Sequence, residues 1–314
     1  MAETNQPIDY RRRNLRLLRI RPAVQAAFTL LWAAPLLWVS EQLGKYVRSL
    51  PSCVFHCYYA GGLVCPAASL SCPIGIIGQL CALGVVPVLA IGSIVLAGGL
   101  VGSLVCGWAC PFGFIQDLLS KIPLPKFRIP AWMGYGRYAV LIVLVIVVPY
   151  TMGLYGVAYE DNNATICAWC PAGATEGGLP GVVAGLVKGG VHGGEAGILD
   201  ADGALLLSWK KTAIIVAFLL AAMLTFRPWC TVLCPLGGAL SLFNRVSVFH
   251  LRFHRQACTQ CNTCRSRCAY GVEVDVAVNT GRCLRCLECT TCGAIRPMLA
   301  ALNALDKSPS GPKA

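Results

Sequence analysis

The chain has 314 residues, of which 56% are hydrophobic and only 13% charged, and its mean hydropathy is +0.64. This composition lies outside the range of ordinary soluble domains. Nineteen cysteines, most of them two or three residues apart, favour thiolate ligation of metal over a secreted disulfide scaffold. The composition therefore predicts a membrane protein that carries metal centres.

Four apolar runs are long enough to cross about 30 Å of hydrocarbon as helices. They lie at 23–44, 80–105, 136–157 and 204–226. We interpret the first as an uncleaved anchor, because it is too long for the core of a signal peptide. The predicted fold class is an all-α membrane protein, a four-transmembrane-helix bundle of two parallel half-repeats, followed by a C-terminal ferredoxin-like domain.

The charged residues predict the orientation of these spans. The net charge of +12 is distributed as +4 over 1–22, +3 over 111–137 and +7 over 227–314, against −5 over 158–207. Since basic loops stay on the cytoplasmic side, both termini are expected in the cytoplasm of a multi-pass protein of the bacterial inner membrane. Topology and anionic lipid account for the basic excess, so no nucleic-acid partner is expected.

A tetrad Cys-Pro-x-Gly occurs four times, once after each predicted span. Three copies have a second cysteine three or four residues upstream, and for the first copy the nearest candidate is Cys65. The tetrads begin at Cys72, Cys110, Cys170 and Cys234, and the upstream partners of the last three are Cys106, Cys167 and Cys230. Because spans alternate in direction, the tetrads lie alternately outside and inside.

A proline directly after cysteine suits the first position of a helix and places the cysteine at the N-cap. Free backbone N–H groups and the helix dipole then stabilise a thiolate and an anionic cluster. With the two halves around one axis, the pattern predicts two membrane clusters. The inner [4Fe-4S] cluster is assigned to Cys106, Cys110, Cys230 and Cys234, and the outer one to Cys65, Cys72, Cys167 and Cys170.

The outer set leaves alternatives open. Cys53 and Cys57 lie in the same exterior segment and could replace Cys65, serve another cluster or form a disulfide. The alternative for all four tetrads is a set of packing cysteines near Pro-Gly turns. Cys81, inside the second apolar run, is expected to be a small buried residue and not a ligand.

The strongest pattern is in the tail, where two cysteine runs lie fourteen residues apart. The first follows C-x2-C-x2-C-x3-C, and in paired-cluster ferredoxins the fourth cysteine of each run serves the other cluster. Zinc is the alternative metal, but its sites normally pair two short knuckles. The predicted sets are Cys258, Cys261, Cys264 and Cys292 for one cluster, and Cys283, Cys286, Cys289 and Cys268 for the other.

Four regions follow from these patterns. They are a basic N-terminus (1–22), a four-helix membrane domain with four Cys-Pro-x-Gly half-helices (23–247), a ferredoxin-like domain with two [4Fe-4S] clusters (248–302) and a disordered tail (303–314). Covalent haem is not expected, because no C-x-x-C-H occurs.

Together these motifs resemble the membrane-bound polyferredoxins of the NapH type, which include MauN-like and NosR-like proteins. The likeness rests on the four spans, the Cys106-Gly-Trp-Ala-Cys110-Pro and Cys230-Thr-Val-Leu-Cys234-Pro motifs and the ferredoxin run. It implies electron transfer between quinol and other redox proteins, with no substrate chemistry, and so no catalytic residues, in this subunit. The outer cysteines depart from the NapH pattern and favour conduction across the whole membrane.

We therefore expect an electron-transfer subunit of a membrane redox complex with four [4Fe-4S] clusters. Its expected partners are an exterior cytochrome or oxidoreductase subunit, or quinol, and a cytoplasmic redox protein. Sixteen cysteine ligands imply about sixteen irons per chain. The alternative function is metal reduction or oxidase assembly by a CcoG-like polyferredoxin, which shares the inner Cys-x3-Cys-Pro pattern.

Overall fold

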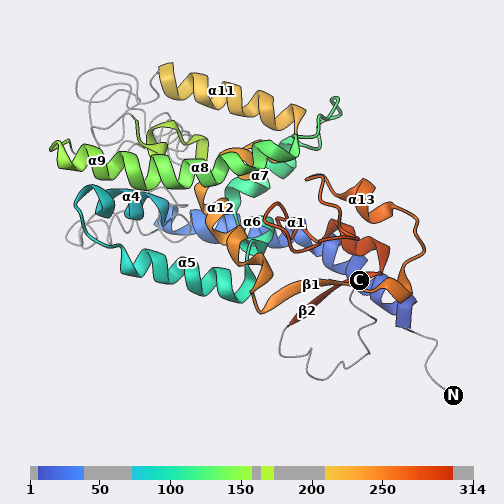
Figure 1. Ribbon diagram of the computed structural model, residues 1–314. Coiled ribbons are helices and arrows are strands. Elements are labelled where there is room, and N and C mark those ends of the chain that lie inside the picture. The colour runs from blue at the N-terminus through green and yellow to red at the C-terminus, as the bar shows by residue number, and fades with distance from the viewer. Residues whose placement is uncertain (1–5, 39–72, 158–163, 173–208, 300–314) are drawn as a thin grey trace.

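The structure is a computed structural model that describes residues 6–38, 73–157, 164–172 and 209–299 (Figure 1). It is mainly helical, with a short two-stranded sheet near the C-terminus. The first helix, α1 (Gln6–Trp38), begins in the basic N-terminal segment and continues into the first apolar run. The basic segment and the start of the predicted span are thus one continuous helix.

The second apolar run, predicted as one span over 80–105, is divided among three helices. These are α4 (Ile74–Ala82), α5 (Val88–Val101) and α6 (Leu104–Trp108). The run is therefore not one continuous helix, because it contains helix-ending residues. Gly84 adopts φ +70° after α4, and its N–H donates to the Cys81 carbonyl, which is the usual way a glycine ends a helix. Pro87 then precedes α5 and has no N–H to donate.

The third apolar run forms the longest apolar helical stretch of the described residues, Ala131–Leu154, and its mean hydropathy is 2.0. It consists of a 3-10 turn (Ala131–Tyr135), α8 (Gly136–Ile142), a π-helical turn (Val143–Val147) and α9 (Val148–Leu154). Among the described residues, this is the one helical stretch long and apolar enough to cross a membrane. The prediction of a span over 136–157 agrees with it.

The fourth run corresponds to α11 (Trp209–Leu224), which has sixteen residues. At 1.5 Å per residue this helix is about 24 Å long, and α5, with fourteen residues, is about 21 Å long. Both are shorter than a typical hydrocarbon core of about 30 Å. The four-span bundle therefore stays a prediction. Residues 39–44 of the first run and 204–208 of the fourth run lie outside the described residues.

Two short helices follow the inner cysteine motifs. They are α7 (Pro111–Leu119) and α12 (Pro235–Leu242), and each begins with the proline of its tetrad. A π-helical turn (Trp229–Leu233) precedes α12, a 3-10 turn (Phe243–Arg245) follows it, and another such turn (Ile166–Trp169) precedes the third tetrad.

The C-terminal part contains little regular structure. Strand β1 (Phe249–Phe253) pairs antiparallel with β2 (Ile295–Leu299), with Leu251 opposite Pro297. Between the strands lie a 3-10 turn (Arg255–Ala257), α13 (Thr263–Arg267), a second 3-10 turn (Glu288–Cys292) and both tail cysteine runs. We call residues 249–299 the tail domain.

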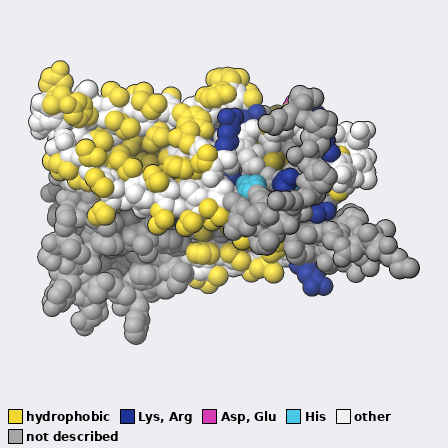
Figure 2. All heavy atoms as spheres, turned by 60° about the horizontal axis from the view of Figure 1, so that its bottom comes forward, with side chains coloured by type: hydrophobic (Ala, Val, Ile, Leu, Met, Phe, Trp, Pro, Cys, Tyr) yellow, Lys and Arg dark blue, Asp and Glu magenta, His cyan; other side chains and the backbone are white. Residues whose placement is uncertain are grey.

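The apolar helices and the tail domain lie at opposite ends of the molecule. Figure 1 shows α5, α8–α9 and α11 running in roughly the same direction, with the tail domain beyond one end of them. Figure 2 shows apolar side chains over the helical part and Lys and Arg side chains gathered toward the tail domain. Leu89 and Leu154, which are 89% and 70% exposed, belong to the apolar surface. An apolar surface of this kind is expected where helices face lipid.

Three groups of buried side chains hold the parts together. The largest joins α4, α5, α8 and α12 and includes Cys106 and Cys230. A second fills the tail domain around Leu251, and a third packs α7 against α11, where the rings of Phe112 and Phe218 stack 4.8 Å apart. Leu284 of the tail domain is completely buried in the first group. The tail domain is therefore packed into the helical part.

Candidate metal centres

One cavity in the tail domain is lined by four cysteines that were predicted to share a cluster. Cys268 lies on its wall together with Cys283, Cys286 and Cys289. The rest of the lining consists of the apolar side chains Leu251, Val272, Val274, Val278, Leu284 and Leu287, with Tyr270 and Arg285. The fold thus brings the last cysteine of the first run to three cysteines of the second. A set of four convergent thiols in an apolar shell fits a [4Fe-4S] cluster.

The backbone of the two runs has the same unusual conformation at equivalent positions. In each run, the residues just before and just after the second cysteine are left-handed. They are Gln260 (φ 55°) and Asn262 (φ 54°) around Cys261, and Arg285 (φ 49°) and Leu287 (φ 67°) around Cys286. Left-handed conformations cost an L-residue about 1 kcal/mol or more. Backbone turns that include such residues form concave nests of N–H groups, which occur at many iron–sulfur sites.

The other predicted tail set is only partly enclosed. The Cys292 thiol lies close enough to Cys261 and Cys264 to influence the pKa of both. Cys292 reaches this place because its 3-10 turn packs against α13. Cys258 lies three residues before Cys261, whose side chain is exposed, while Cys264 is buried. The two fourth cysteines therefore lie with the opposite runs, as the crossed assignment expects, and the binding of iron by these residues stays a prediction.

Burial and local hydrogen bonding give the tail thiols different pKa values. Burial raises the pKa of Cys283 to about 12 and also raises the pKa of Cys286 and Cys289. The hydroxyl of Thr263, whose oxygen lies 3.2 Å from the Cys261 sulfur, lowers the pKa of that exposed thiol to about 6. Because iron binds the thiolate, loading of the buried set is expected to release protons.

The inner cysteines occupy helix N-caps, as predicted. Cys110 is the N-cap of α7 and Cys234 that of α12, with Pro111 and Pro235 as the first helical residues. The Cys234 sulfur accepts a hydrogen bond from the Gly237 N–H at 3.3 Å. Both cysteines thus lie at the positive end of a helix, and the Cys234 sulfur accepts a hydrogen bond there.

The upstream cysteines of the inner motifs are close to each other. Cys106 and Cys230 are 6% and 4% exposed, belong to the same buried group and interact electrostatically. The Cys230 sulfur also accepts a hydrogen bond from the Gln116 side-chain amide at 3.1 Å. A donor aimed at a buried sulfur fits an anionic thiolate there.

The glycine of each inner tetrad permits the same backbone contact. A Cβ at Gly113 would lie 2.9 Å from the Cys106 carbonyl oxygen, and one at Gly237 would lie 3.3 Å from that of Cys230. In both repeats, therefore, the helix after the tetrad packs on the carbonyl of the upstream cysteine. This explains the fourth position of the tetrad by close approach of backbone to backbone.

A buried ionic network surrounds the inner motif. Asp117 of α7 accepts two hydrogen bonds from Arg227, at 2.6 and 2.5 Å, and one from Arg21 of α1 at 2.6 Å. Arg227 also donates to the Cys106 carbonyl at 2.5 Å, and Arg21 to the Glu288 carboxylate at 3.0 Å. The network therefore joins α1, both inner repeats and the tail domain.

The protonation of Asp117 reflects this surrounding. Burial by itself would raise its pKa, but the hydrogen bonds and charges of Arg227 and Arg21 outweigh burial and hold the pKa below its usual value. The carboxylate is thus ionised at neutral pH and balances part of the charge of two largely buried guanidinium groups.

The inner motif touches one of the tail runs directly. A Cβ at Gly107 would lie 2.7 Å from the carbonyl oxygen of Leu284 and 3.2 Å from that of Arg285. These two residues lie between Cys283 and Cys286 in the chain. Helix α6, which carries Cys106, is therefore in close contact with the backbone of the segment that carries two cysteines of the tail cavity.

The outer set is described only in part. Cys53, Cys57, Cys65 and Cys72 lie outside the described residues, and the side chain of Cys167 is not described. Cys170 is half-buried and directly precedes the helical Pro171. Cys81 is half-buried and packs against the main buried group, so the structure places it as the expected packing residue, although less fully buried than predicted.

Within the described ranges, no three His, Cys, Asp or Glu side chains lie close enough to hold a single metal ion. A cubane differs from such a site, because each of its four cysteines binds a different iron. The tail cavity, the nests and the capped thiols fit that larger group.

Several residues of these sites were missed in the sequence. Arg21 and Arg227 were counted only as topology signals, and Gly107, Gln116 and Asp117 were not singled out. One signal was present: Asp117 is the only acidic residue between 111 and 137 and follows Cys110 by seven residues. A lone carboxylate in a basic segment next to a cysteine motif indicates a specific cationic partner.

Two segments of the chain, 82–130 and 212–254, match a family described as a 4Fe-4S binding domain. The first segment contains Cys106 and Cys110, and the second contains Cys230 and Cys234. The two matched segments thus coincide with the inner repeats.

Curated relatives extend this result. The chain is similar to the uncharacterized protein MJ0750 of Methanocaldococcus jannaschii (27% identity, covering 67% of this chain and 74% of that protein) and to the regulatory protein NosR of Pseudomonas aeruginosa (26%, covering 52% and 19%). A 75-residue segment is 35% identical to the putative electron transport protein YccM of Escherichia coli, covering 23% of this chain and 21% of that protein. No solved structure matches.

The family match and these relatives support an iron–sulfur protein of electron transport. The matched region is only about a fifth of NosR and of YccM, so the whole-protein roles of those relatives do not follow for this chain. Membership of the NapH type in particular stays a prediction.

Proposed function

We propose that this chain is the iron–sulfur electron-transfer subunit of a membrane redox complex, which conducts electrons between the membrane and clusters in its tail domain. The observation that carries the proposal is the backbone contact of Gly107 with Leu284 and Arg285. It joins the inner cysteine site to the tail cavity without an intervening layer of side chains.

Four cysteine sets would hold the clusters, with the assignments predicted from the sequence. Their chemistry is the uptake and release of single electrons. The protein supplies apolar enclosure around the tail cavity, helix N-termini at Cys110 and Cys234, and the Gln116 amide at Cys230. Enclosure and hydrogen bonds to sulfur are the features by which a protein sets a cluster's potential.

The exposure of the cysteines and the contact between their segments suggest the order in which electrons would pass the sites. Cys106 and Cys230 are buried, the cavity set contacts the inner motif, and Cys261 of the remaining set is exposed. The path therefore runs from the inner site through the cavity set to the set of Cys258, Cys261, Cys264 and Cys292. A soluble cytoplasmic redox protein would exchange electrons at this last set.

Gly107→Ala tests the contact on which the path depends. The added Cβ would lie 2.7 Å from the Leu284 carbonyl oxygen and would push α6 and the segment around Leu284 apart. We expect weaker magnetic coupling between the reduced inner and cavity clusters, measured by electron paramagnetic resonance, and slower electron transfer between them. Iron content should be retained, because no ligand is changed.

Gly92→Ala is the matched control, since a Cβ there meets nothing within 4 Å. It should leave both the coupling and the transfer rate unchanged. Unchanged coupling and rate in Gly107→Ala, with full iron content, would show that electrons do not pass through this contact.

Cys170→Ser tests conduction to the outer face. If Cys170 holds an outer cluster, the variant should lose about four irons and stop exchanging electrons with an exterior partner. Reduction of the tail clusters from the cytoplasmic side should continue. Cys81→Ser is the control and should keep its iron. A Cys170→Ser protein with full iron and normal transmembrane flow would favour a quinol route confined to the inner side.

A further inference from the structure

A groove of about 900 Å³ lies between the start of the long apolar stretch and the tail domain. One wall is formed by Ala131–Tyr138, another by the end of α12 and the turn after it, and the third by the tail segment Gly271–Arg282. None of the predicted cluster ligands lines it.

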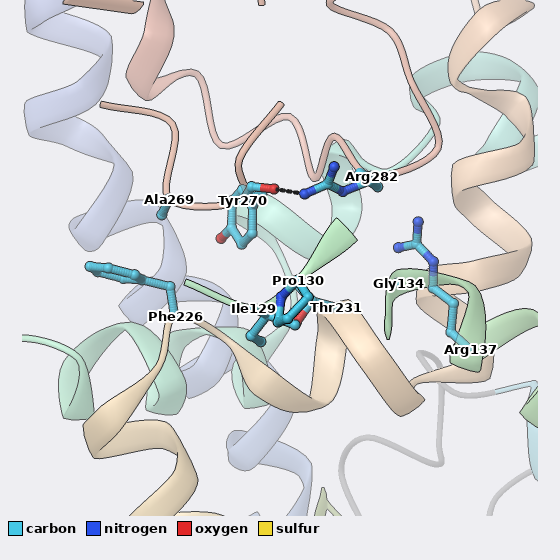
Figure 3. A pocket seen from close by; sticks show the side chains of 9 residues that line it. All are labelled: Ile129, Pro130, Gly134, Arg137, Phe226, Thr231, Ala269, Tyr270 and Arg282. Atoms are coloured by element: carbon cyan, nitrogen blue, oxygen red, sulfur yellow. Dashed lines mark hydrogen bonds between the residues drawn. The ribbon is translucent and has the colours of Figure 1, made fainter. Parts of the chain in front are cut away.

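The groove is rich in groups that bind anions. Arg137, Arg245 and Arg282 line it, against the single carboxylate of Glu273. Arg137 is 1% exposed, donates to the Gly281 carbonyl, and forms no ion pair with any residue in the described part of the chain. In Figure 3, which shows the small neighbouring pocket, Arg137 projects from the start of α8 toward the tail segment that carries Arg282.

Two buried donors on the lining have no hydrogen-bond partner. They are Nε of Arg137 and the hydroxyl of Thr280. Buried polar groups in folded proteins are nearly always paired, so orphaned donors of this kind indicate a missing acceptor. The guanidinium of Arg137 can only donate, while the Thr280 hydroxyl can also accept. Together with the two further guanidinium groups of the lining, the unpaired Arg137 Nε favours an anion as the missing acceptor.

The position of the groove selects the kind of anion. Trp132 and Tyr135, at the start of the apolar stretch, are each 72% exposed, and exposed Trp and Tyr at a helix end are typical of the membrane–water boundary. Leu242 and Val276 on the groove are 61% and 71% exposed, so the lining offers apolar surface beside its charges. Such a site accommodates a negative headgroup and acyl chains together.

We propose that this groove binds the phosphate headgroup of an anionic phospholipid from the leaflet that faces the tail domain. Basic pockets beside membrane helices on the cytoplasmic side are suited to such headgroups. The lipid would bridge the long apolar stretch, α12 and the tail domain, with its phosphate beside the lining residues Arg137 and Thr280. This inference does not depend on the proposed electron transfer.

Native mass spectrometry of the purified holoprotein in detergent tests the proposal. The probes are phosphatidylglycerol, phosphatidylcholine with the same acyl chains, and inorganic phosphate. We expect phosphatidylglycerol to bind at least about ten times more tightly than phosphatidylcholine, and inorganic phosphate not to displace it at equal concentration.

Variants locate the site. Arg245→Gln should weaken phosphatidylglycerol binding about five-fold, because it removes one positive charge from an exposed position. Thr280→Val should also weaken it, without loss of stability, since the hydroxyl has no partner within the protein. Arg255→Gln, an exposed arginine outside the groove, is the control and should bind as the wild type does.

Three results would overturn the proposal. Equal binding of the two lipids would show that the headgroup charge is not recognised. Binding of inorganic phosphate as tight as that of phosphatidylglycerol would make the groove a site for a free anion. Unchanged binding in both Arg245→Gln and Thr280→Val would place the lipid elsewhere.

Discussion

Replacing Asp117 with asparagine should lower the free energy of unfolding by roughly 3–5 kcal/mol, the usual cost of removing one partner from a buried ion pair. The carboxylate forms ion pairs with both Arg227 and Arg21, whose side chains are only 1% and 9% exposed. Asparagine keeps the shape but removes the carboxylate that pairs with Arg227, and it leaves Arg21 with Glu288 alone as its ionic partner. The measurement is chemical or thermal unfolding of the detergent-solubilised protein.

The same variant should disturb the inner site, because Arg227 also donates to the Cys106 carbonyl. We therefore expect reduced iron occupancy there together with the lower stability. The control is Asp275→Asn, which breaks an ion pair with Arg265 whose side chains are 44% and 30% exposed. Exposed pairs contribute little, so its unfolding midpoint should be unchanged. Equal unfolding free energies of the two variants would mean that the ion pairs of Asp117 do not stabilise the fold.

Cys289→Ser should remove the cluster of the tail cavity and interrupt electron flow. Cys289 is 7% exposed and lies on the cavity wall. The intact protein is expected to hold about sixteen irons and the variant about twelve, because one four-iron cluster loses a ligand. Electrons from the membrane side should then fail to reach the exposed tail set. Iron analysis and stopped-flow absorbance at the cluster bands provide the two readouts.

Cys258→Ser is the matched comparison for Cys289→Ser. It should also lose about four irons, but reduction of the cavity cluster from the membrane side should continue, because Cys258 does not line the cavity. If Cys289→Ser transferred electrons to the exposed set at the wild-type rate, the proposed order of sites would be wrong. If both variants kept all their iron, the crossed assignment would fail.

The spacing of residues determined the local geometry of the sites. Proline after Cys110 and Cys234 predicted the N-caps, and the structure confirms both. The run spacing also predicted that Cys268 would lie with the second run and Cys292 with the first. Such features can be predicted because two or three intervening residues restrict where the next cysteine can lie.

The helix boundaries were harder to predict, although their cause is local. The run 80–105 reads as one span because its apolar residues dominate, yet Gly84 and Pro87 divide it. Gly102, with φ +55°, divides it again before α6, and a Cβ there would lie 2.7 Å from the Arg285 guanidinium. The second break thus lies against a residue of the tail domain, a contact that hydropathy does not register.

Contacts between distant parts of the chain were decided only by the tertiary structure. Arg21, Asp117 and Arg227 are each separated by about a hundred residues, and Gly107 meets Leu284 across a still longer interval. The sequence by itself determined an apolar chain with repeated cysteine motifs and their likeness to iron–sulfur proteins. The packing of the tail domain into the helices decided which motifs touch, which charges pair and where a groove remains. The physical reason is that the number of residues between two cysteines restricts geometry only over a few bonds. Burial and ion pairing act through space, between segments that are far apart in the chain and whose distance in the fold the cysteine spacing does not determine.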